Sequence, residues 1–239
     1  MNNVRTVSDT KRTFYTLHAR PINTIYRRVV EELMVEMHLL SVNVDFNYNP
    51  IYALGVVTTF DRFMEGYQPE RDKESIFNAL IKAVEDEPQR YTQDAQKLET
   101  LAKDFNFEDL VGWLSQKNDS DKDAELQSQL SAIASNSKFK YNRLFAIGLF
   151  SLLESSNPEL VKDEKQLNES LKAIADGLNI SDDKLVKDLE LYRSNLDKMA
   201  QALVVMADLV AADRKKREQR ATQDSQKTTT TTPPNSDEE

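Results

Sequence analysis

The chain of 239 residues contains no cysteine, only two histidines and only five glycines. The absence of cysteine excludes disulfides, thiolate catalysis and every cysteine-ligated zinc or iron–sulfur site. The small number of glycines favours a helix-rich protein, because α/β and all-β folds use more glycine turns. A reducing, intracellular compartment is compatible with this composition.

Long hydrophobic runs are also missing. None approaches the roughly 18–20 apolar residues of a membrane span, and the longest, residues 144–150 (LFAIGLF), is better interpreted as a buried core helix. The N-terminus lacks an apolar signal core, so we expect no secretion. With 39% apolar residues, 30% charged residues and a mean hydropathy of −0.60, the sequence predicts a soluble protein whose membrane association is peripheral.

The residue groupings that an active site needs are absent as well. A di-iron helical bundle requires Glu-x-x-His, whereas Glu36 lies two residues before His38 and on another helix face. There is no HExxH, no glycine-rich phosphate loop and no Gly-x-Ser-x-Gly. We therefore predict no catalytic residue, no metal and no cofactor. An enzyme with dispersed carboxylates is an alternative that would require a cleft with paired acids, drawn from Asp61, Glu65, Glu85 and Glu87.

Charge is distributed unevenly, although the formal net charge is −9. Residues 1–30 carry a net charge of +5, residues 31–213 carry −15 and residues 214–239 carry +1. The acidic body argues against nucleic-acid binding, which needs a basic surface to displace counterions. The basic N-terminal stretch is most simply a solvated helix face. The alternative is contact with an anionic membrane or an acidic partner.

Proline and glycine mark the ends of a series of expected helices. Ser8 or Asp9 is expected to cap a first helix through Leu17, and Pro21 to open a long amphipathic helix. The stripe of that helix would consist of Ile22, Ile25, Val29, Leu33, Met37 and Leu40. Residues 41–50 alternate apolar and polar side chains without a partner strand, so we expect an extended loop. Further helices are expected over 50–64, 69–86, 88–105, 107–117, 122–135, 138–155 and 158–177.

The clearest pattern lies in the C-terminal part. Apolar residues recur there at alternating steps of four and three: Leu185, Leu189, Tyr192, Leu196, Met199, Leu203, Met206 and Val210. A 3.5-residue repeat predicts a long, coiled-coil-like helix, and Ser181 gives it a capped start. The polar tail from about residue 221 is expected to be disordered. The predicted organisation is a helical globular domain (1–180), a long helix with a basic end (181–220) and a tail (221–239).

The end of this long helix is the predicted partner-binding site. It combines apolar positions that can anchor a partner with a basic segment (RKKREQR) that can face an acidic partner or anionic lipid. The simpler explanation of the basic segment is charge that complements the helix macrodipole. The residues assigned to the site are Leu203, Met206, Val210, Arg214, Lys215, Lys216, Arg217 and Arg220.

Several segments together resemble the thylakoid formation protein family, which is also described as a photosystem II biogenesis factor. They are residues 5–12 (RTVSDTKR), 20–23 (RPIN), 25–40 (IYRRVVEELMVEMHLL) and 53–64 (ALGVVTTFDRFM). The resemblance is specific over about 5–110 and looser to about 215. It implies an all-helical protein with a coiled-coil C-terminal helix, associated with the membrane-bound FtsH protease and helping it accumulate. Plant members carry a transit peptide, so a match that begins at Arg5 suggests a cyanobacterial form.

The sequence thus predicts an all-α, multi-helix bundle that acts as a non-enzymatic adaptor in thylakoid biogenesis and photosystem II repair. Its expected partners are the FtsH protease complex and photosystem II assembly components. Its expected place is the cytoplasmic face of the thylakoid membrane, with a fraction soluble in the cytoplasm. The alternative is a small-molecule or pigment sensor, which would need an apolar pocket near Trp113 or between helices. We predict instead that Trp113 belongs to the core.

Overall fold

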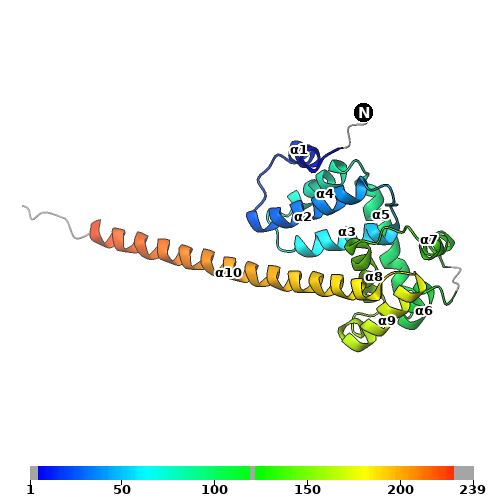
Figure 1. Cartoon of the computed structure of the whole chain (residues 1–239). Helices are drawn as coiled ribbons and strands as arrows, with labels where there is room; N and C mark the ends of the chain where they lie inside the picture. The colour runs from blue at the N-terminus through cyan, green and yellow to red at the C-terminus, as the bar shows by residue number, and fades with distance from the viewer. Residues whose placement is uncertain (1–4, 119–121, 229–239) are drawn as a thin grey trace, which may run out of the picture. The chain divides into compact units, whose positions relative to one another are not determined.

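The computed structural model describes residues 5–118 and 122–228. Over these residues it consists of helices, turns and loops without a strand, which confirms the predicted all-α class (Figure 1). The elements are, in chain order, α1 (Val7–Leu17), α2 (Thr24–Ser41), α3 (Pro50–Phe63), α4 (Asp72–Ala83), α5 (Pro88–Lys103), α6 (Phe107–Leu114), α7 (Ala124–Ser135), α8 (Arg143–Ser156), the 3-10 turn η1 (Leu160–Lys162), α9 (Glu164–Gly177) and α10 (Asp182–Thr228).

The chain divides into two compact units with the boundary between Arg193 and Ser194. The first unit contains α1 to α9 and the start of α10, and the rest of α10 belongs to the second. Helix α10 runs through Thr228, so residues 221–228, which were expected to be disordered, are helical. Residues 229–239, the remainder of the predicted tail, lie outside the described residues.

Helices α3 and α8 form the most extensive helix pair of the first unit, and α5 packs on both. A glycine on each helix allows the two backbones to approach. A Cβ atom at Gly55 would collide with the carbonyl oxygen of Leu144, and one at Gly148 would collide with that of Ile51. Every residue of α8 from Leu144 to Leu153 is buried, which confirms that the LFAIGLF run is a core helix.

Short polar side chains cap the starts of α1, α2 and α3, and three of the expected helix starts are corrected. Helix α1 is capped by Thr6, whose side chain accepts from the backbone N–H of Asp9 in a capping box, and not by Ser8 or Asp9. Helix α2 begins after Asn23, which caps the N–H of Ile25, and not at Pro21. Helix α4 begins only at Asp72, beyond Pro69. The predicted start of α3 at Pro50 is confirmed, with Asn49 as its cap.

The segment between α2 and α3 is a loop, as expected, and aromatic rings hold it against the body. The Phe46 ring packs edge-on against Tyr52 with 4.9 Å between centroids, and Tyr48 packs likewise against Tyr91 at 5.1 Å. The Tyr48 hydroxyl donates to Asp94 at 2.7 Å. These contacts hold the loop against α3 and α5.

Candidate functional site

Helix α2 has a buried face and a face that lines a groove. Its buried residues are Tyr26, Val30, Leu33, Met34, Met37, His38 and Leu40. The predicted stripe was therefore partly wrong: Ile25 and Val29 are half-buried, and the positions that follow them, Tyr26 and Val30, face the core. The outward positions recur at helical spacing from Thr24 to Leu39 and line the groove.

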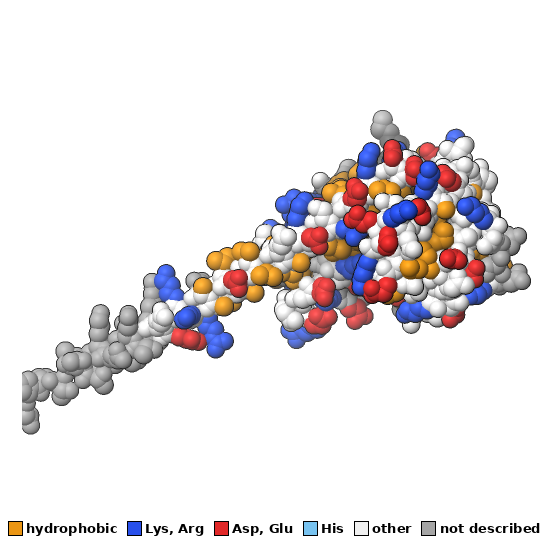
Figure 2. Space-filling model, turned by 90° about the horizontal axis from the view of Figure 1, so that it is seen from below, with side chains coloured by type: hydrophobic (Ala, Val, Ile, Leu, Met, Phe, Trp, Pro, Cys, Tyr) orange, Lys and Arg blue, Asp and Glu red, His pale blue; other side chains and the backbone are white. Residues whose placement is uncertain are grey.

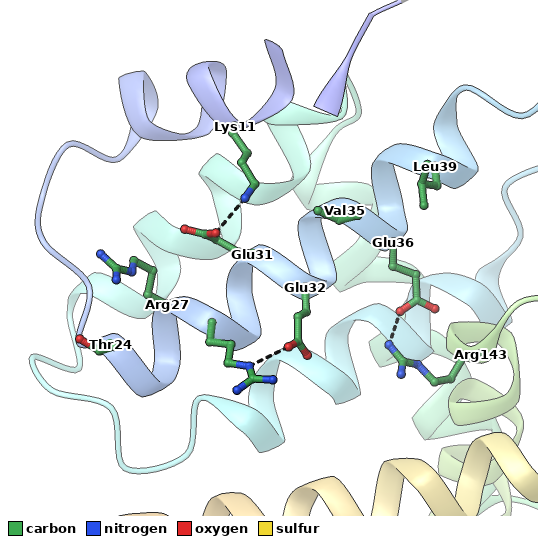
Figure 3. A pocket seen from close by; sticks show the side chains of 10 residues that line it. Lys11, Thr24, Arg27, Glu31, Glu32, Val35, Glu36, Leu39 and Arg143 are labelled. Carbon is green, nitrogen blue, oxygen red and sulfur yellow. Dashed lines mark hydrogen bonds and ion pairs between the residues drawn. The ribbon is translucent and has the colours of Figure 1, made fainter. Parts of the chain in front are cut away.

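The groove has a volume of about 620 Å³ and is floored by α2, with one lining residue from α1 and one from α8 (Figure 3). Lys11 of α1 and Arg143 of α8 reach it from opposite sides of α2 (Figure 3). Sequence analysis identified the polar face of α2, but not these two residues, because they come from distant parts of the chain. The lining residues are Lys11, Thr24, Arg27, Arg28, Glu31, Glu32, Val35, Glu36, Leu39 and Arg143.

Each carboxylate of the groove has a partner within the protein. Glu31 accepts from Lys11 Nζ at 2.8 Å and from the Tyr15 hydroxyl at 2.6 Å, and these hydrogen bonds hold its pKa below the usual value. Glu32 pairs with Arg28 at 3.0 Å, and Glu36 pairs with Arg143 at 2.5 Å. Burial raises the pKa of the Glu36 carboxyl, against the opposing effect of the Arg143 guanidinium. The acidic groups of the groove are thus already compensated.

The two histidines are structural groups that attach α1 to the body. His38 Nδ1 lies 2.8 Å from the Thr10 hydroxyl, and His18 Nδ1 lies 3.0 Å from the Ser75 hydroxyl. Both side chains are buried, and burial lowers the pKa of each. Burial therefore favours the neutral form of each imidazole. Among the described residues, no three His, Asp or Glu side chains are grouped so that they could hold a metal ion.

Other predicted positions contribute little to a chemical site. Asp61, Glu65, Glu85 and Glu87 are all exposed, and Glu85 pairs with Arg5 at 3.1 Å, which gives no support to a carboxylate enzyme. Trp113 is buried and stacks on Phe105, with 5.1 Å between ring centroids. Its predicted place in the core is confirmed.

The predicted partner site lies on the part of α10 that belongs to the second unit. Val210 is 66% exposed, and Leu203 and Met206 are half-exposed. Three further apolar residues that sequence analysis did not select are more than half exposed: Val204, Val205 and Leu209. Apolar side chains are visible along this stretch in Figure 2. The predicted residues are accessible, as a contact surface requires, and their role in binding stays a prediction.

The basic residues of the predicted site follow the apolar ones along α10. Arg214, Lys215, Lys216 and Arg217 are exposed, and Arg214 pairs with Glu218 one turn later at 2.9 Å. Arg220 lies in α10, but its side chain lies outside the described part of the structure. No helix in the described residues has the length and apolar character needed to cross a membrane.

The described residues define an all-helical protein, and comparison with known proteins agrees with this fold class. A sequence model of the thylakoid formation proteins matches residues 6–221. Protein Thf1 of Nostoc punctiforme is 77% identical over 223 residues, covering 93% of this chain and 95% of its own length. Protein Thf1 of Acaryochloris marina is 58% identical over 218 residues, covering 91% and 88%.

A solved structure of Psb29 at 1.55 Å is similar to this fold, with a TM-score of 0.77 and 46% sequence identity. The similarity covers 90% of this chain and 99% of that structure. The chain therefore belongs to the thylakoid formation protein family, and the resemblance seen in the sequence is confirmed. The family takes part in thylakoid formation and is not a known enzyme family.

Proposed function

We propose that this chain is a non-enzymatic adaptor that supports photosystem II biogenesis and repair by promoting accumulation or activity of the membrane FtsH protease. The observation that carries the proposal is the second unit, where exposed apolar residues of α10 precede four exposed basic residues. An exposed apolar group next to concentrated charge is typical of a surface that binds a partner. The family resemblance supports the protease as that partner.

The two units differ in how far their apolar side chains are buried, and the proposal gives them different roles. The first unit holds a packed core built on α3, α5 and α8. The start of α10 is held against this unit by the Tyr192 ring, which packs on Phe63 of α3. It is also held by Asp188, which accepts from the Tyr141 hydroxyl.

Leu203, Met206 and Val210 supply apolar contact area, whereas residues 214–217 supply charge for an acidic protein surface or for anionic lipid of the thylakoid. The protein then acts peripherally, on the cytoplasmic face of the membrane.

The test is a pull-down from solubilised thylakoids with three forms of the protein. These are the full-length chain, a chain truncated after Ala212, and a full-length variant with Gln at positions 214–217. Glutamine keeps helix propensity while it removes the charge. The matched control places Gln at three exposed basic residues of the first unit, Lys162, Lys165 and Lys172.

We expect FtsH to be recovered with the full-length and control proteins and to be lost with the other two. Equal recovery by all forms would transfer recognition to the helical body and contradict the basic-end assignment. If no form recovers the protease, the adaptor proposal itself fails, and an indirect role in photosystem II assembly replaces it.

A further inference from the structure

The groove on α2 offers a second contact surface, which lies entirely within the first unit and is independent of the α10 residues. We propose that this groove binds an amphipathic helix of a partner protein. The bound helix places apolar side chains over Val35 and Leu39 and a carboxylate over Arg27. It is a site for an acidic, helical protein segment.

The length and course of the groove match a helix. Its α2 residues extend from Thr24 to Leu39 along one face. At a rise of 1.5 Å per residue this floor is about 22 Å long, which corresponds to roughly four turns of a partner helix. Lys11 and Arg143 stand on either side of α2 (Figure 3). A helix that lies in such a trough presents side chains at i, i+4 and i+7 to the floor.

The two ends of the floor differ in chemistry. At the C-terminal end of α2, Val35 is half-buried and Leu39 is 57% exposed. The loop after α2 adds two further exposed apolar side chains, Val42 at 38% and Val44 at 95%. A concentration of exposed apolar residues in one short segment is typical of a surface that a partner covers. Apolar side chains of a partner therefore fit this end of the groove.

At the N-terminal end of α2 the unpaired charge is positive, so this end of the groove fits a negatively charged partner group. Glu31, Glu32 and Glu36 are paired within the protein, whereas Arg27 is exposed and forms no hydrogen bond or ion pair among the described residues. The first turn of α2 contains no acidic residue, so its positive macrodipole end is uncompensated by its own side chains. A partner carboxylate near Arg27 would pair with its guanidinium and would also compensate the positive end of the α2 macrodipole.

A helix accounts for these features better than an anionic membrane surface does. The floor of the groove lies between Lys11 and Arg143, which reach it from opposite sides of α2 (Figure 3). Lys11 and Arg143 are also engaged by Glu31 and Glu36, which removes them from lipid headgroup binding. A side chain that projects from a helix can enter this space.

The experiment measures fluorescence anisotropy of a labelled, hydrocarbon-stapled 18-residue peptide with the purified full-length protein. The acidic peptide has Glu in its first turn and Leu at i, i+4 and i+7 thereafter, and stapling lowers the ordering cost of binding. A second peptide replaces each Glu by Lys, and a third replaces each Leu by Ser. We expect saturable binding of the acidic peptide alone.

Substitutions in the groove then locate the binding. Arg27→Glu and Leu39→Glu are each expected to weaken binding of the acidic peptide about five- to tenfold, the effect of losing one exposed charge or apolar contact. The controls Arg12→Glu and Leu209→Glu alter exposed residues outside the groove and should leave it unchanged. Arg27→Glu should also strengthen binding of the Lys peptide, which loss of folding could not produce.

Three results would overturn the proposal: no saturable binding of the acidic peptide, equal binding of the acidic and Lys peptides, or indifference to Leu39→Glu. Binding of phosphatidylglycerol vesicles with the same sensitivity to Arg27→Glu and Leu39→Glu would assign the groove to lipid and reject the helix. Because Leu209→Glu alters only the α10 surface, failure here and failure of the protease proposal are distinguishable.

Discussion

Two apolar runs in this chain have similar composition and opposite environments. Residues 144–150 of α8 (LFAIGLF) are all buried, with Leu144 and Leu149 fully inaccessible. Residues 202–212 of α10 (ALVVMADLVAA) contain a single charged residue, yet Val204, Val205, Leu209 and Val210 are each more than half exposed. The first run belongs to the core, and the second lies in a separate unit.

The difference shows that local hydrophobicity does not decide burial. Gly148 within the first run allows α8 to touch the backbone of α3, so the run is enclosed by neighbouring helices. The second run has no such constraint within its own unit. An apolar helix surface that the fold leaves uncovered lowers solubility, so its retention favours a binding role. Substitutions in the buried region should therefore lower stability, whereas substitutions in the exposed run of α10 should leave stability nearly unchanged.

The largest effect is expected from Leu185→Ala, at the buried start of α10. Leu185 is fully inaccessible, and removal of its side chain leaves a cavity, so the free energy of unfolding should fall by about 3 kcal/mol. Urea denaturation followed by circular dichroism measures this change. A loss below about 0.5 kcal/mol would show that the start of α10 is not part of the core.

The next effect concerns the contact between α3 and α8. Gly148→Ala should lower the free energy of unfolding by about 1–3 kcal/mol, because the added methyl group collides with the carbonyl oxygen of Ile51. The control is Gly112→Ala, where the methyl group meets only the flexible side chain of Asn118. Equal stability of the two variants in thermal unfolding would contradict the close backbone approach.

A pH effect should be confined to the first unit, which contains both histidines. Burial lowers the pKa of His18 and His38, so the unfolded chain binds more protons than the folded chain around and below the ordinary value of 6.5. The free energy of unfolding should therefore decrease as the pH falls from 7.5 to 6.0. In urea titrations at these two pH values, His38→Asn should show a smaller decrease; an unchanged decrease would exclude His38 as a source.

The smallest effect on stability is expected in the second unit. Val210→Ala should change the free energy of unfolding by no more than about 0.5 kcal/mol, because the side chain is already 66% exposed. Calorimetric unfolding of the full-length variant provides the measurement. A loss comparable to that of Leu185→Ala would mean that Val210 is enclosed in the folded chain.

Sequence patterns predicted the helices well where a local signal marks their ends. Asn49 and Pro50 fix the start of α3, and the heptad pattern identified α10. The start of α2 was misplaced at Pro21 because proline suits a first helical turn, whereas the cap that forms is Asn23. The predicted stripe of α2 was off by one position at Ile25 and Val29 only, since the apolar residues that follow them, Tyr26 and Val30, face the core instead.

The groove could not be predicted in the same way. Arg28 and Glu32, one helical turn apart, form an ion pair, whereas Glu31 binds Lys11 and Tyr15 of α1 and not Arg27 one turn before it. Arg143 reaches Glu36 from α8, across more than one hundred residues of chain. Such partners are determined by tertiary packing, and the residue pattern of a single helix carries no information about which distant residues pack against it. For α10, the heptad pattern selected Leu203, Met206 and Val210, and the exposed fractions of the side chains added Val204, Val205 and Leu209.

The most direct test of the account uses a full-length variant with Gln at positions 204, 205, 209 and 210, compared with the unmodified chain. Recovery of FtsH from solubilised thylakoids is measured together with the unfolding midpoint of each purified protein. The account predicts an unchanged midpoint and loss of protease recovery, because these side chains contribute contact area and not core packing. Protease recovery equal to that of the unmodified chain would contradict it.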